Sequence, residues 1–234
     1  LAAGRRADAA RAWRRAAAAS FVTRGASHFR DGNMHLAALV WRQALALDAA
    51  NPPALQGFGS LAMLEERFED AVRWYGRALE AAPGSGDARE GIAKAREALA
   101  WRDRIPALER ASERGAPGAL CDLGNAYWHL GRPKVAEALY RRVLAADPGD
   151  VRAWGNLGSA LVSAGRFTDA IAAYEAALRA RPDYTEAMLN LAATYQGLGR
   201  RARAIEWARK ALAVRPDDAR ARALLAELTP DGGT

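Results

Sequence analysis

Three prolines at a constant spacing constrain the fold of this chain more than any other feature. Pro148, Pro182 and Pro216 lie 34 residues apart, and each follows an apolar run typical of an amphipathic helix. A fixed period of this length indicates stacked copies of one small helical unit, because such a unit cannot bury its apolar face alone. Counting back from the prolines gives three repeats, 117–150, 151–184 and 185–218.

Glycines within these repeats predict where the chain turns and where helices approach closely. Gly131, Gly165 and Gly199 share one repeat position, where a left-handed residue is needed to end the first helix and reverse the chain. Gly158 lies inside a helix, where glycine costs about 1 kcal/mol relative to alanine. We therefore expect close approach of the partner helix at Ala170, with Trp154, Leu161 and Tyr174 filling the space around the crossing.

Repeat 151–184 resembles the tetratricopeptide repeat, a helix-turn-helix unit of the same length. The matching signature residues are Trp154, Leu157, Gly158, Ala170, Tyr174, Ala177 and Pro182. The repeat departs from the signature only at Leu161, where tyrosine is usual. The resemblance implies an all-α fold, an α-solenoid of helix-turn-helix repeats forming a right-handed superhelix, and a function in protein binding.

The repeat register divides the whole chain. Two weaker repeats occupy 18–85, namely 18–51 and 52–85, and three regular repeats occupy 117–218. Between them the period slips, and 86–116 is predicted to form a degenerate helix pair, with Pro106 opening the short second helix. A basic helix is predicted over 1–17, and a capping helix with a frayed tail over 219–234.

Charge is concentrated at the two ends. The net charge is +7; residues 1–50 carry eight Arg against three Asp, and residues 200–222 carry eight basic against three acidic residues. Solvated outer faces account for such segments, and so would contact with an acidic protein, a lipid surface or nucleic acid. Within the terminal segments 1–17 and 200–222, Trp13 and Trp207 are the only aromatic residues, so base stacking is not expected.

No motif for catalysis, a cofactor or a metal ion is found. His28, His35 and His129 are the only histidines, without metalloprotease spacing, and neither a nucleophile elbow nor a phosphate-binding glycine loop occurs. The single Cys121 excludes an internal disulfide. The sequence therefore predicts no small-molecule substrate, and no apolar run approaches the ~18 residues of a membrane span. A start at Leu1 is interpreted as non-native, which leaves open a fragment, a cytoplasmic protein or a processed periplasmic one.

The candidate site is one side of the first helices, which the family turns toward its concave groove. Repeat positions 2, 5, 9 and 12 lie on that side by helical spacing. Position 12 gives apolar residues in most repeats, which either pack against the neighbouring first helix or line a groove. The resemblance also implies that asparagines bracket a peptide backbone here, since an amide both donates and accepts. The predicted groove residues are Phe29, Met63, Asn125, Trp128, Asn156, Ser159, Asn190 and Gln196.

These observations favour a non-catalytic scaffold or adaptor that binds an acidic or extended segment of another protein. One alternative is a substrate-docking or regulatory region of a larger enzyme, such as a repeat-bearing glycosyltransferase. The other is an anionic-surface or nucleic-acid binder that acts through the basic ends. The lysines and asparagines that clamp a carboxylate in some chaperone-binding members are not reproduced, because Cys121 and Gly155 stand where the first lysine would be.

Overall fold

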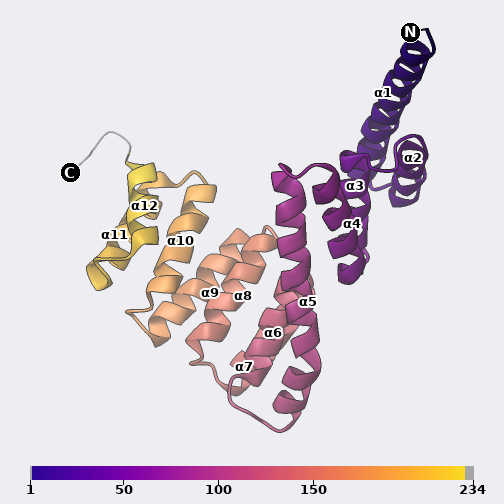
Figure 1. Cartoon of the computed structure of the whole chain (residues 1–234). Coiled ribbons are helices and arrows are strands. Elements are labelled where there is room, and N and C mark those ends of the chain that lie inside the picture. Colours follow the sequence, from indigo (N-terminus) through magenta and orange to yellow (C-terminus); the bar gives the residue numbers. More distant parts are fainter. Residues whose placement is uncertain (1, 230–234) are drawn as a thin grey trace. The chain divides into compact units, whose positions relative to one another are not determined.

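The computed structural model describes residues 2–229, all of whose regular elements are α-helices (Figure 1). Leu1 and residues 230–234, which include most of the predicted tail, lie outside the described residues, as do the side chains of residues 2–4, 6 and 7. The helices are α1 (Ala2–Arg30), α2 (Met34–Leu47), α3 (Pro52–Leu64), α4 (Phe68–Ala81), α5 (Gly86–Glu113), α6 (Ala119–His129), α7 (Pro133–Ala146), α8 (Val151–Ser163), α9 (Phe167–Ala180), α10 (Thr185–Gly197), α11 (Arg201–Val214) and α12 (Ala219–Leu228). No helix within this range is both long enough and apolar enough to cross a bilayer.

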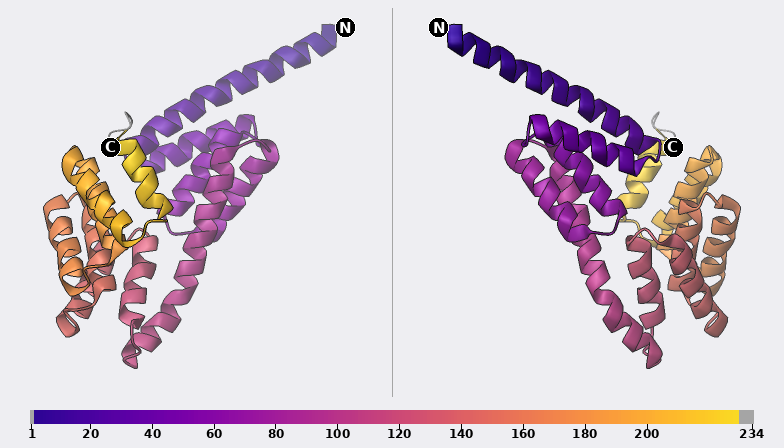
Figure 2. Two further views of the ribbon diagram at one scale, coloured as in Figure 1. Left: turned by 90° about the vertical axis from the view of Figure 1, so that its left-hand side faces the viewer. Right: turned by 90° about the vertical axis from the view of Figure 1, so that its right-hand side faces the viewer.

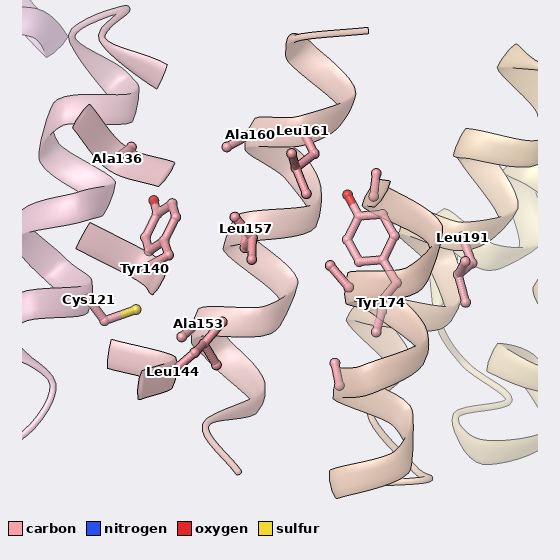
Figure 3. Close-up of a cluster of buried hydrophobic side chains, with 14 residues drawn as sticks. Cys121, Ala136, Tyr140, Leu144, Ala153, Leu157, Ala160, Leu161, Tyr174 and Leu191 are labelled. Atoms are coloured by element: carbon pink, nitrogen blue, oxygen red, sulfur yellow. The ribbon is translucent and has the colours of Figure 1, made fainter. Parts of the chain in front are cut away.

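The chain divides into two compact units, residues 1–100 and residues 101–234. In the second unit α6–α7, α8–α9 and α10–α11 form three successive helix pairs, and α12 packs against α11 and α10. Their shared core is built from one helix after another: Tyr140 on α7, Leu157 on α8, Tyr174 on α9 and Leu191 on α10 (Figure 3). The fold is thus an all-α helical repeat solenoid, as the sequence predicted.

The turns between paired helices form where the sequence predicted them. Gly131, Gly165 and Gly199 have φ angles of 73°, 72° and 70°, the left-handed region that favours glycine. The residue after each glycine donates its backbone N–H to a carbonyl near the end of the first helix, for example Arg166 to Leu161. These bonds satisfy terminal carbonyls of the first helix and reverse the chain.

Gly158 makes room for an aromatic ring, which differs from the expectation that it faces Ala170. A Cβ added at Gly158 would fall inside contact distance of the Tyr174 ring. The equivalent pair in the preceding repeat is the same, since a Cβ at Gly124 would lie 2.5 Å from Cε1 of Tyr140. The glycine therefore lets the ring of the second helix lie directly on the backbone of the first.

The first unit begins with one long helix. α1 is continuous from Ala2 to Arg30, so the predicted basic helix and the first helix of repeat 18–51 are a single element. Figure 2 shows its N-terminal half extending beyond α2. Its C-terminal half packs on α2, where Trp41 is buried and its ring centroid lies 5.6 Å from that of Phe29 and 6.1 Å from that of Phe58 on α3.

The predicted helix pair over 86–116 was wrong. α5 runs without interruption from Gly86 to Glu113, with Pro106 inside it. Its N-terminus is capped by Ser85, whose hydroxyl accepts a hydrogen bond of 3.1 Å from the N–H of Ala88. A proline removes one backbone donor but does not by itself reverse the chain, and no glycine stands near Pro106 to form a turn. The chain turns only beyond the helix, at Gly115, which has a φ of 69°.

Candidate functional site

Two adjoining hollows on one side of the second unit contain most of the predicted groove residues. One, of about 350 Å³, is lined by residues of α6, α8, α9 and α10, among them Trp128, Ser159 and Asn190. The other, of about 200 Å³, is lined by Asn125, Trp128, Asn156 and Ser159 together with His129 and Tyr140. Trp128 and Ser159 belong to both hollows, so the two form one surface. We call the surface formed by Asn125, Trp128, Asn156, Ser159 and Asn190 the asparagine face.

Asn125 and Asn156 are held together across two repeats. The Oδ1 atom of Asn125 accepts hydrogen bonds from Nδ2 of Asn156, at 2.7 Å, and from the hydroxyl of Tyr140, at 2.8 Å. These two bonds fix the orientation of the Asn125 amide. Its Nδ2 and the Oδ1 of Asn156 make no further hydrogen bond among the described residues, and no buried side-chain polar atom there lacks a partner. One donor and one acceptor are therefore left on an accessible surface.

Ser159 continues this pattern in the next repeat. Its hydroxyl lies 3.2 Å from that of Tyr174, in the same relation as Asn125 to Tyr140. In the first unit, Ser60 and Tyr75 repeat it at 3.0 Å. The core tyrosine of each of these repeats thus has its ring on a glycine and its hydroxyl at the side of the first helix that the sequence assigned to the groove.

Trp128 lies exposed at the junction of the two hollows, with 37% of its surface accessible. Its ring meets His129 edge-on, with centroids 5.0 Å apart. His129 in turn stacks on Trp101 of α5 at 4.3 Å, with the two rings nearly parallel. The histidine is therefore supported from one side while it supports Trp128 from the other, which limits the freedom of an otherwise exposed indole.

Three predicted residues lie elsewhere. Phe29 and Met63 belong to the first unit and are partly buried in its own clusters, Phe29 beside Trp41 and Met63 beside Tyr75. Gln196 donates to Glu227 of α12 at 2.8 Å, so the capping helix engages it. The structure brings the other five residues together on the asparagine face.

Sequence reasoning missed two contributors to this surface. Tyr140 was not among the predicted groove residues. Its ring is buried, and nothing in the repeat pattern indicates that its hydroxyl reaches Asn125. His129 lies one residue beyond Trp128, outside the positions used to define the groove. Its spacing of four residues from Asn125 was the available signal, since such pairs share a helix face.

Burial is the main cause of the pKa shifts of Cys121 and Tyr140 near the asparagine face. Burial raises the pKa of the Cys121 thiol, so the sulfur stays protonated and weakly nucleophilic at neutral pH. Burial, with a smaller contribution from Cys121, also raises the pKa of Tyr140. Asp122 pairs with Arg152 of the next repeat at 2.5 Å. Among residues 2–229 no group of three or more histidine, cysteine, aspartate or glutamate side chains could hold a metal ion.

Three solved structures illustrate what this chain is similar to in fold. YrrB, described as a TPR protein with an unusual peptide-binding site, is 21% identical to this chain. The match covers 87% of this chain and 89% of the YrrB chain, with a TM-score of 0.43. MamA is 20% identical over 87% and 94% of the two chains, with a TM-score of 0.40. The first TPR of Spaghetti (RPAP3), bound to the HSP90 peptide SRMEEVD, is 23% identical over 47% and 88%, with a TM-score of 0.46.

Sequence comparison identifies the repeats themselves. None of the curated proteins compared with the chain matches it significantly. Family profiles described as tetratricopeptide repeat match residues 93–151, 121–185 and 161–228. Together these matches extend from residue 93 to residue 228, more than half of the 234 residues. With their helix pairs, glycine turns and ring-on-glycine crossings, the repeats show that the chain belongs to the tetratricopeptide repeat family.

Proposed function

We propose that this chain is a non-catalytic interaction module that binds an extended segment of a partner protein on the asparagine face. The observation that carries the proposal is the Asn125–Asn156 pair, which is fixed by Tyr140 and leaves one amide donor and one carbonyl acceptor unused. A peptide backbone offers the complementary acceptor and donor at every residue. The pair can therefore bind main chain with little dependence on sequence.

Trp128 supplies the apolar part of this proposed site. Tryptophan is frequent among the residues that dominate binding energy at protein interfaces. Trp128 borders the hollow that reaches Asn190 on α10, so one extended segment could contact the indole and the amides of three successive repeats. The same surface would serve if this chain were the docking region of a larger enzyme.

Replacing Trp128 with alanine tests the proposal. The partner is first identified by affinity purification with the unmodified protein, and its affinity is then measured for each variant. We expect Trp128→Ala to cost about 2 kcal/mol or more of binding free energy, with a much smaller change in thermal stability. The matched control is Trp13→Ala, because Trp13 is also exposed, at 67%, but lies on α1 in the other unit.

The N-terminal half of α1 offers a second candidate for binding, to an anionic surface or an acidic partner. Its arginines include Arg5, Arg11, Arg14 and Arg15, whose side chains are exposed. Changing these four and Arg6 to glutamine should mainly lower the association rate and its salt dependence if they only steer an acidic partner. If the arginine variant abolishes binding while Trp128→Ala leaves affinity unchanged, the asparagine face is not the site.

A further inference from the structure

A larger hollow lies on the opposite side of α8 from the asparagine face. It has a volume of about 680 Å³ and is walled by α7 and α9, with α8 as its floor. The floor residues are Trp154, Leu157 and Leu161, whereas α8 presents Asn156 and Ser159 to the asparagine face. At helical spacing these two sets point in opposite directions. We call this second site the alanine hollow, after Ala145, Ala172, Ala173 and Ala176 in its walls.

Small side chains at positions that hold large ones in the next repeat create the alanine hollow. Repeat 185–218 has Tyr195 and Trp207 where repeat 151–184 has Leu161 and Ala173. Tyr195 and Trp207 are partly buried against the core of the second unit. The smaller pair leaves space between α7 and α9. The volume lies within the ~300–1,000 Å³ typical of ligand pockets.

The lining of the alanine hollow has an apolar floor and a basic rim. Trp154 is held in place because its indole Nε1 donates to the carbonyl of Pro148 at 2.8 Å. The charged lining residues are three arginines, Arg141, Arg166 and Arg179, and one acid, Asp169. Leu144 and Leu161, which border the hollow, are visible in Figure 3.

Two of the arginines are partly neutralised, and the third is not. Arg141 and Arg166 both contact Glu137, at 2.7 and 2.8 Å, and Arg166 also pairs with Asp169. Arg179 is exposed and forms no ion pair within the part of the chain that the structure describes. The rim therefore keeps an uncompensated positive charge beside an apolar cavity.

We propose that the alanine hollow is a second docking site, which takes a bulky apolar side chain from an acidic segment of a partner protein. The apolar floor would bury the inserted side chain, and a carboxylate beside it would pair with Arg179. Such pairing of complementary charge around an apolar anchor gives both attraction and register. The site is separate from the asparagine face, so it stands or falls independently of the proposed function.

A selection from displayed random peptides tests this proposal on the full chain. Bound peptides are screened against two variants and their matched controls. Ala176→Phe fills the hollow from a partly exposed position, and its control is Ala202→Phe at an exposed alanine of α11. Arg179→Glu reverses the free charge, and its control is Arg209→Glu, an exposed arginine outside the hollow that changes net charge equally.

We expect the selection to enrich peptides that carry several aspartate or glutamate residues around a tryptophan, phenylalanine or leucine. Their affinity should fall about tenfold or more in Ala176→Phe and in Arg179→Glu, and less than about twofold in either control. The indole N–H resonance of Trp154, assigned with Trp154→Phe, should shift when such a peptide binds. If the selected peptides depend on Trp128 but not on Ala176, or if no peptide is enriched, the proposal is overturned.

Discussion

At the scale of single residues, a glycine and a ring fix the helix crossing in two of the three regular repeats, α6–α7 and α8–α9. Gly158 lies under Tyr174 and Gly124 under Tyr140, and a side chain on either glycine would overlap the ring. Repeat 185–218 changes both members, because Ala192 stands at the glycine position and Ala208 at the ring position. Both alanines are fully buried. A larger residue on the first helix is thus accompanied by a smaller one on the second.

Gly158→Leu should therefore destabilise the protein by about 2 kcal/mol or more, because the new side chain would meet the Tyr174 ring. Urea unfolding measures the loss. Combining it with Tyr174→Ala should recover part of the loss, as expected for residues in contact. The control is Ala192→Gly, which adds no side chain and should cost about 1 kcal/mol of helix propensity together with about 0.8 kcal/mol for the buried methyl group that is lost. Equal effects of Gly158→Leu with and without Tyr174 would contradict this packing.

Tyr140 should make the protein less stable in alkaline solution. Burial raises the pKa of its phenol in the folded state above the ordinary value of about 10, so the unfolded chain releases this proton first. The stabilisation is complete below that ordinary value and is lost as pH rises above it. In the Tyr140→Phe variant, the free energy of unfolding should decline less steeply as the pH rises above about 10. Burial also raises the pKa of Tyr174, so adding Tyr174→Phe should make the decline shallower still. Superimposable stability curves would refute this assignment.

At the scale of helices, the sequence predicted elements wherever a local residue enforces them. The turns at Gly131, Gly165 and Gly199 were predicted correctly because each requires a left-handed residue. The break at Pro106 was not, because proline weakens a helix without supplying a turn, and the outcome depends on what the surrounding helix packs against. The asparagine face was likewise partly predictable. Helical spacing placed Asn125 and Asn156 on one side, but their contact depends on how neighbouring repeats stack, which no local pattern specifies.

Pro106→Ala should stabilise α5. The alanine restores an N–H that can donate to the carbonyl of Arg102, one turn earlier, and removes the clash of the proline ring, so the gain could reach about 3 kcal/mol. Hydrogen exchange should show slower exchange over residues 103–113. The control is Pro133→Ala, since Pro133 occupies the first turn of α7, where the missing N–H has no intrahelical acceptor. Equal stabilisation by both changes would argue against a cost specific to the interior of α5.

At the scale of the molecule, each helix pair is stabilised chiefly by its immediate neighbours. The core of α10 and α11 is closed by α12, where Ala221 is fully buried beside Met188 and Leu189. Polar contacts reinforce this closure, because Arg201 donates to the carbonyl of Leu228 at 2.6 Å. Among the described residues no further repeat follows α12. The predicted capping helix therefore covers the apolar surface of α10 and α11 in place of another repeat.

Ala221→Asp should loosen only the end of the array. A carboxylate forced into this fully buried position beside Met188 and Leu189 would lose its hydration, and the penalty is several kcal/mol locally. Because repeats interact mainly with adjacent repeats, hydrogen exchange should quicken in α10, α11 and α12 and remain unchanged in α6 and α7. Ala219→Asp, in the exposed first turn of α12, is the control. Uniformly faster exchange throughout residues 101–229 would indicate one cooperative block instead.

In the regular repeats the residues that meet at the helix crossing lie within one repeat, which has a consequence for how such a chain can change in length. Gly158 with Tyr174, and Ala192 with Ala208, are encoded within single segments of 34 residues. A duplicated or deleted segment would therefore carry a complete, already compatible helix crossing. Copy number can change by whole repeats, and each new copy has only to match its two neighbours.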